Sequence, residues 1–101
     1  MMKEAMAAYN QAVRNNPKSA RAYSQRGDGY RRLGRYHQAL LDYNQAIRLA
    51  PDSADSYVGR AFTHTLLSKD KEAQQDLERA VELGIESSLL EGEIEALTKR
   101  R

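Results

Sequence analysis

The chain has no cysteine and no tryptophan, only two prolines, and no long hydrophobic run. Without cysteine, neither a disulfide framework nor a thiolate metal site can form. No apolar stretch approaches the roughly 20 residues that a membrane-spanning helix needs, and the N-terminus lacks the apolar core and cleavage site of a signal peptide. These absences predict a soluble protein with no membrane partner, and a cytoplasmic location is the default expectation.

The chain also lacks an excess of charge of one sign. Sixteen basic and fourteen acidic residues are interspersed and leave a net charge of +2. That charge is too small to indicate a nucleic-acid partner. A weaker hypothesis, an RNA- or DNA-binding helical array, would depend on the basic clusters 31–35 and 99–101.

No pattern of catalytic or metal-ligating residues is present. The two histidines, His37 and His64, do not form the His-Glu-x-x-His pattern of a zinc helix. Gly27-x-Gly29 falls inside a predicted helix with no strand before it, so a dinucleotide site fails on context. The serines form no nucleophile elbow. We therefore expect no enzymatic activity, no cofactor and no metal.

Good helix formers dominate the chain, and its apolar residues follow helical spacing. The spacing predicts helices over 3–15, 20–33, 36–49, 53–67, 70–83 and 88–101. Ser19 and Asp70 are predicted N-caps, and Ser88-x-x-Glu91 predicts a capping box. Gly34 is predicted to end a helix in the left-handed conformation. No segment alternates as a strand does, so the fold class is all-α, built from antiparallel helix pairs.

The second half of the segment 20–53 recurs in both directions at an offset of 34 residues. Both copies keep the alanines and a large residue at the position of Tyr43, and the upstream copy also keeps the proline. The matched sets are Ala5, Tyr9, Ala12 and Pro17; Ala39, Tyr43, Ala46 and Pro51; and Ala73, Leu77 and Ala80. A fixed period of this size is typical of stacked structural repeats.

These residues resemble the tetratricopeptide repeat family, whose unit carries aromatic-x2-Leu-Gly-x2-Tyr on its first helix and Ala-x3-Phe…Pro on its second. The central repeat matches at Tyr23, Gly27 and Tyr30, followed by Ala39 and Tyr43. In the next repeat, His64 replaces the second tyrosine, which implies a packing role. The resemblance implies one domain, a right-handed α-solenoid over 1–101. It divides into the second helix of a truncated repeat (1–19), two full repeats (20–53 and 54–87) and a capping helix (88–101).

Three departures from the family pattern carry expectations of their own. Arg26 and Arg60 replace the leucine of the first helix, and we expect their stems to cover apolar surface while their charges reach water. Ile85 stands where a third proline would be. The chain also opens on a second helix without its partner. Its uncovered face predicts either self-association as a homo-oligomer or a fragment of a longer protein, and it comprises Met2, Ala5, Met6 and Ala12.

In the family, the first helices line a concave groove that receives peptides or helices. The resemblance places in that groove Arg21, Ser24, Gln25, Asp28, Arg31, Arg32, Asp55, Val58, Phe62 and Leu66. We expect a non-enzymatic interaction scaffold that binds an acidic or amphipathic peptide of an unidentified protein. Ser24, Asp28 and Asp55 occupy places where one subgroup clamps chaperone C-termini with lysine and asparagine, which disfavours that ligand. Alternatively, Leu90, Ile94 or Leu97 of the last helix cover Phe62 and Leu66 as a cap.

Overall fold

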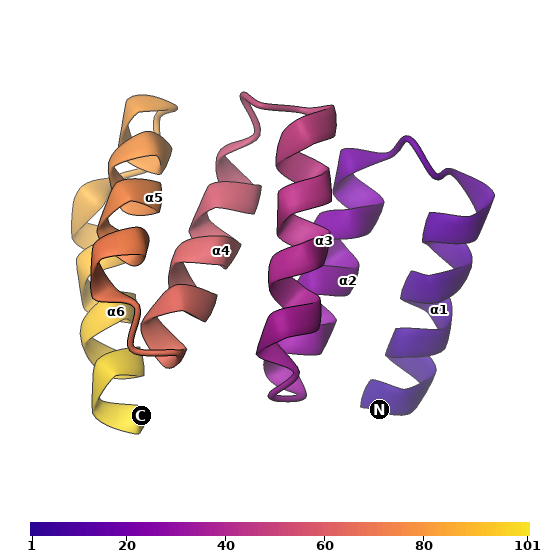
Figure 1. Ribbon diagram of the computed structural model, residues 1–101, viewed down its shortest axis with the longest axis horizontal. Helices are drawn as coiled ribbons and strands as arrows, with labels where there is room; N and C mark the ends of the chain where they lie inside the picture. The colour runs from indigo at the N-terminus through magenta and orange to yellow at the C-terminus, as the bar shows by residue number, and fades with distance from the viewer.

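The computed structural model describes all 101 residues and consists of six helices joined by short turns (Figure 1). The helices are α1 (Met2–Asn15), α2 (Ala20–Arg32), α3 (Tyr36–Leu49), α4 (Ala54–Leu66), α5 (Asp70–Glu82) and α6 (Ser87–Arg100). There is no strand, and the predicted all-α class is confirmed. None of the helices is long and apolar enough to cross a membrane.

Two kinds of turn join the helices. The residues that follow α1 and α3, Asn16 and Ala50, have φ of −142° and −143° because a proline comes next in each case. After α2, α4 and α5 the chain turns at residues with positive φ, namely Gly34 (77°), Ser68 (60°) and Gly84 (110°). The prediction for Gly34 is thus confirmed, and Ser68 takes the same conformation one period later.

The helix N-termini show one correct and two wrong predictions. The hydroxyl of Ser19 caps α2 by accepting a hydrogen bond from the Ala22 amide at 3.1 Å. Asp70 is not a cap, because it is the first residue of α5 and Lys69 stands at the cap position. The capping box at Ser88 is also absent: Glu86 is the last extended residue before α6, so Ser88 already lies in the first helical turn.

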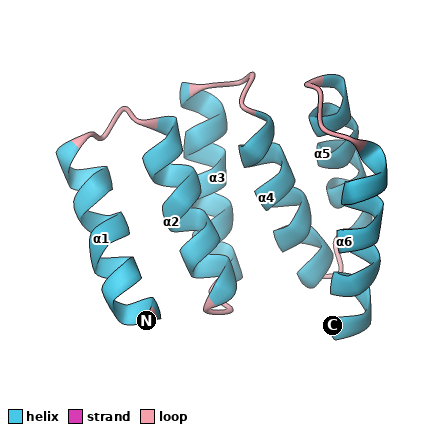
Figure 2. Ribbon diagram, turned by 180° about the vertical axis from the view of Figure 1, so that it is seen from behind, coloured by secondary structure: helices cyan, strands magenta, loops and turns pink.

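The helices stand side by side in a row, with α1 at one end and α5 and α6 at the other (Figure 2). The most extensive contacts join α2 to α3 and α4 to α5, which are the two predicted helix pairs. Between the pairs, α4 packs against α3. At the ends, α1 lies on α2, and α6 lies mainly on α4 with little contact to α5.

Tyr43 occupies the centre of the row. Its ring has 0% of its surface exposed. A Cβ added at Gly27 of α2 would lie 3.0 Å from the ring, and a Cβ at Gly59 of α4 would collide with it. The two glycines therefore make the room that this tyrosine fills. Toward the C-terminal end, a hydrophobic core consists of Ala61, Leu77, Ala80 and Leu90.

The expectation that Arg26 and Arg60 extend their charges into water is wrong. Arg26 binds both carboxylate oxygens of Asp42 on α3, at 2.9 and 2.8 Å, and Asp42 is only 5% exposed. Arg60 binds Asp76 on α5 in the same way, at 2.8 and 2.7 Å. The prediction failed because it considered the arginines without the aspartates that lie opposite them on the second helices. The charges are satisfied inside each helix pair.

Candidate functional site

The predicted groove residues lie on two first helices that contact each other directly. The hydroxyls of Ser24 on α2 and Ser56 on α4 are 2.5 Å apart, and Ser56 is fully buried. Beside this contact, α2 and the start of α4 border a polar hollow, which is lined by Ala20, Arg21, Gln25, Asp28, Ser53 and Asp55. The structure therefore brings together four of the predicted residues around one depression.

Asp28 and Arg31 are held by Tyr43. The Tyr43 hydroxyl donates a hydrogen bond to Asp28, while Arg31 Nε donates one to the Tyr43 oxygen at 3.3 Å. Arg31 also lies 3.5 Å from the Asp28 carboxylate. Burial, with the nearby Asp28 charge, raises the pKa of the Tyr43 hydroxyl, so the phenol stays protonated and remains a donor. Asp28 and Arg31 are therefore already satisfied within the molecule.

Phe62 joins this network to the apolar end of the predicted site. The Arg31 guanidinium lies 5.5 Å from the centre of the Phe62 ring, within cation–π range. Phe62 and Val58 also pack against the C-terminal core, together with Ile94 of α6. Leu90 and Leu97 of α6 are buried, whereas Phe62 is half-buried, so α6 adds to this core and leaves part of Phe62 accessible. Leu66 remains half-buried.

Arg21 and Arg32 differ from Arg31 because both are exposed. Neither makes a side-chain hydrogen bond or a salt bridge in the structure. They are the predicted basic residues that remain available to a ligand. Asp55, at the start of α4, is exposed as well and gives the hollow a negative edge.

Sequence reasoning missed that α6 extends the face formed by α2 and α4. Leu90 and Leu97 are buried, and they stand 34 residues after Ser56 and Thr63, which are also buried. The same offset carries the groove positions of α4 onto exposed residues of α6, namely Leu89, Gly92, Ala96 and Arg100. A Cβ at Gly92 would meet nothing within 4 Å. Continuing the 34-residue period past Gly84 would have predicted that these residues of α6 occupy the groove positions.

The C-terminal residue holds α6 in place. Arg101 donates a 2.9 Å hydrogen bond to the carbonyl of Thr65, near the end of α4. Its guanidinium also binds both carboxylate oxygens of Asp70, one of them at 3.0 Å. This hydrogen bond lowers the pKa of the Asp70 carboxyl. One arginine thereby ties the end of α6 to the turn between α4 and α5.

The predicted self-association residues lie on α1 with mixed surroundings. Met6 lies against Gly29 of α2, so it belongs to the α1–α2 contact. Met2, Ala5 and Ala12 are half-buried, and the neighbouring Ala8 is exposed. The open strip on α1 is thus made mainly of alanine.

His64 occupies a structural position between α4 and α5. Its Nε2 lies 3.8 Å from an Asp76 oxygen, and its Nδ1 is buried without a hydrogen-bond partner. Burial lowers the pKa of this imidazole. No group of three or more histidine, aspartate or glutamate side chains is placed to hold a metal ion.

Comparison with known proteins finds similarity to tetratricopeptide repeats. Residues 27–68 match a family model described as a TPR repeat. The first tetratricopeptide domain of Spaghetti (RPAP3), bound to the HSP90 peptide SRMEEVD, is 25% identical, with a TM-score of 0.85 over 98% of this chain and 80% of that chain. The TPR2B domain of yeast Sti1, in complex with pHsp70, is 23% identical, with a TM-score of 0.84 over 99% and 85%.

The second tetratricopeptide domain of human RPAP3, in complex with the HSP70 peptide SGPTIEEVD, is 24% identical, with a TM-score of 0.80 over 95% of this chain and 80% of that chain. A comparison with curated protein sequences finds no match. The repeat model, the 34-residue period and the fold of the similar structures agree. Residues 27–68 therefore match the tetratricopeptide repeat family, and the chain as a whole has the fold of tetratricopeptide repeat domains.

Proposed function

We propose that this chain is a non-enzymatic interaction module that binds an acidic, amphipathic peptide along the face formed by α2, α4 and α6. We call this surface the inner face. The observation that carries the proposal is the pairing of exposed, unneutralised cations with an adjoining apolar strip. Arg21 and Arg32 supply the cations on α2, and Val58, Phe62 and the 67% exposed Leu89 supply the strip.

The charges of the inner face favour a ligand with acidic side chains. Asp28 is offset by Arg31 and by the Tyr43 hydroxyl, so it adds little negative potential. At the C-terminal ends of the helices, Arg32 of α2 and Arg100 of α6 are both exposed. A peptide with carboxylates on one side and apolar residues on the other would match this pattern.

Similar domains bind peptides that end in EEVD, but this chain offers a different set of groups. Ser24 and Asp28 stand where we expected a clamp for a terminal carboxylate to need lysine and asparagine, and Asp55 adds a further negative charge nearby. We therefore infer that acidic side chains, and not a free C-terminus, are recognised. This distinction can be measured directly.

The experiment uses the labelled peptide SRMEEVD as the free acid and as the C-terminal amide, with fluorescence anisotropy as the readout. We expect the two forms to bind within about threefold of each other, and an Arg21→Glu/Arg32→Glu variant to weaken both at least about tenfold. The matched control is Arg14→Glu/Arg48→Glu, which makes the same charge change on α1 and α3. Equal binding by the variant, or strong dependence on the free acid, would contradict the proposal.

Arg31 and Phe62 are poor positions for this test. Both are tied into the Tyr43 network and the C-terminal core, so replacing them would change stability together with binding. Variants at the exposed arginines separate the two effects. Circular dichroism of each variant confirms that the helices are retained.

A further inference from the structure

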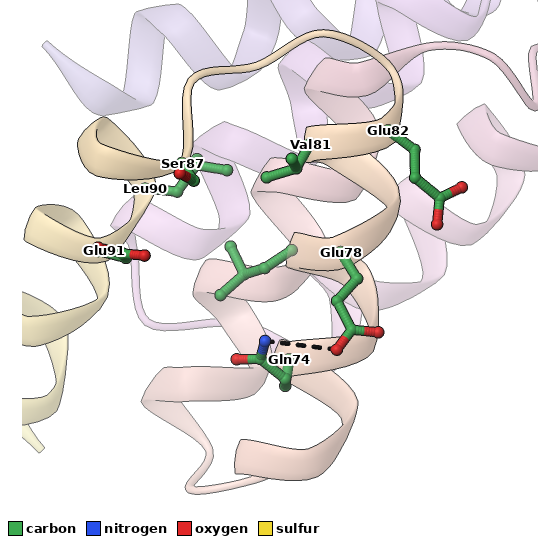
Figure 3. A pocket seen from close by; sticks show the side chains of 8 residues that line it. Gln74, Glu78, Val81, Glu82, Ser87, Leu90 and Glu91 are labelled. Carbon is green, nitrogen blue, oxygen red and sulfur yellow. Dashed lines mark hydrogen bonds between the residues drawn. The ribbon is translucent and has the colours of Figure 1, made fainter.

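A second concave site lies between α5 and α6 (Figure 3), and its lining includes none of the residues named for the inner face. Its floor is apolar and consists of Leu77 and Val81 of α5 with Leu90 of α6. Its rim carries three glutamates, Glu78 and Glu82 of α5 and Glu91 of α6. We call this site the α5–α6 cleft.

The cleft exists because the repeat pattern changes at this point. Tyr43 fills the corresponding space between α3 and α4, where its ring excludes a side chain at Gly59. Leu77 stands at the equivalent position 34 residues later, and its smaller side chain has no ring to fill the space between α5 and α6. In addition, α6 rests mainly on α4 and contacts α5 little. The space between α5 and α6 is therefore left open, and Val81 remains 42% exposed.

The rim is negatively charged and largely without cations. Glu78 and Glu91 make no salt bridge, and Glu78 accepts only a 3.5 Å hydrogen bond from Gln74 (Figure 3). Glu82 is bound by Arg79 at 3.0 Å. The Arg79 guanidinium also lies 5.9 Å from the Tyr57 ring, so it is engaged with the α4 side of α5.

We propose that the α5–α6 cleft is a docking site for a cationic amphipathic helix of a partner protein. Its apolar side chains would seat on Val81, Leu77 and Leu90, and lysines or arginines one turn to either side would meet Glu78 and Glu91. A third helix laid along two neighbouring helices matches the way helices pack in this fold. The site is opposite in charge to the inner face and so selects a different partner.

The probe is a labelled 14-residue helical peptide with leucines at every third or fourth position and lysines between them. A second peptide has glutamate in place of each lysine. We expect the lysine peptide to bind, the glutamate peptide not to bind, and the Glu78→Lys/Glu91→Lys variant to lose at least about tenfold in affinity. Val81→Asp places a charge on the exposed part of the floor and should reduce binding to a similar extent.

The matched control is Glu4→Lys/Glu93→Lys, which changes the net charge equally at exposed positions outside the cleft. Binding that falls as far in this control as in the cleft variant would show attraction to net charge alone and would overturn the proposal. NMR shifts of the lysine peptide complex centred on Phe62 and Leu89, instead of on Val81, would also overturn it. So would concentration-dependent dimers protecting Val81, since they would assign the cleft to a second copy.

Discussion

The guanidinium of Arg60 and the carboxylate of Asp76 form a two-point ion pair that joins α4 to α5. The same pair recurs between Arg26 and Asp42 one repeat earlier. In both, the arginine also reaches an asparagine on the preceding second helix, Asn44 for Arg60 and Asn10 for Arg26. Each arginine therefore connects three successive helices.

Breaking the Arg60–Asp76 pair should cost stability, whereas replacing both partners should not. We expect Arg60→Leu alone to destabilise by ~2–4 kcal/mol, because it removes both hydrogen bonds to the nearly buried Asp76 carboxylate. The double variant Arg60→Leu/Asp76→Ala removes both charges and restores the family's leucine, so its free energy of unfolding should lie within ~1 kcal/mol of the starting chain. Urea unfolding of the single and double variants measures the coupling. A double variant that loses as much stability as Arg60→Leu, or more, would contradict this expectation.

Adding a side chain at a glycine that faces Tyr43 should lower the stability of the protein, whereas adding one at Gly92 should raise it. Gly59→Ala should destabilise by ~1–3 kcal/mol, because its methyl group would collide with the Tyr43 ring. Gly27→Leu should cost a similar amount for the same reason. Gly92→Ala is the control, since it meets nothing and should stabilise α6 by ~0.5–1 kcal/mol. Thermal melts of the three variants check the order, and an unchanged Gly59→Ala would refute the assigned packing.

His64 should make stability depend on pH below neutrality. Burial lowers the pKa of its folded form below the ordinary value of 6.5, so the unfolded chain binds the proton more readily. The contribution of neutral His64 to the free energy of unfolding is therefore fully present above about pH 6.5, and it is lost as the pH falls toward the folded pKa. His64→Tyr restores the residue found at Tyr30 and should flatten this part of the profile. Melting temperatures between pH 7.5 and 5 provide the test, and equal slopes would exclude His64 as the cause.

Arg101 should govern how firmly α6 is held. Arg101→Ala removes both the hydrogen bond to Thr65 and the contacts with Asp70. We expect faster amide hydrogen exchange in the second half of α6 and little change in α2 and α3. Arg100→Ala is the control, because Arg100 is exposed and makes no such bonds. If exchange is equally fast in both variants, Arg101 does not hold the helix.

Self-association through α1 remains a separate prediction. The alanine strip, with exposed Ala8 between half-buried Ala5 and Ala12, would allow close approach of a second helix. If this strip mediates dimers, light scattering should show mass rising with concentration, and Ala8→Lys should abolish the rise. A constant monomer mass over the accessible concentration range would rule the interface out.

The regular features of the fold were predictable from the sequence because they are local and periodic. The helices follow apolar spacing, and the turns follow Pro17, Pro51 and Gly34. The ion pairs were also encoded, since Arg26 and Asp42 recur together at Arg60 and Asp76. They were missed because each arginine was compared with the family's leucine and not with the aspartate 16 residues later.

Other features had no local signal. Arg101 and Asp70 are 31 residues apart and meet only because α6 lies back along α4. The α5–α6 cleft depends on where α6 comes to rest, which the pattern of its own residues does not specify. The true start of α6 was misplaced because Ser87 and Ser88 are both acceptable near a helix N-terminus. The predicted inner-face residues stay predictions until a ligand is tested.

Tyr43 has one further consequence, for the way the molecule unfolds. In repeat proteins, stability is approximately the sum of the repeats and of the contacts between neighbours. Because the Tyr43 ring is shared by Gly27 of one repeat and Gly59 of the next, neither repeat can open without exposing it. The central helices should therefore melt as one cooperative unit. Beyond Leu77 no such shared ring exists, so the C-terminal end should fray first.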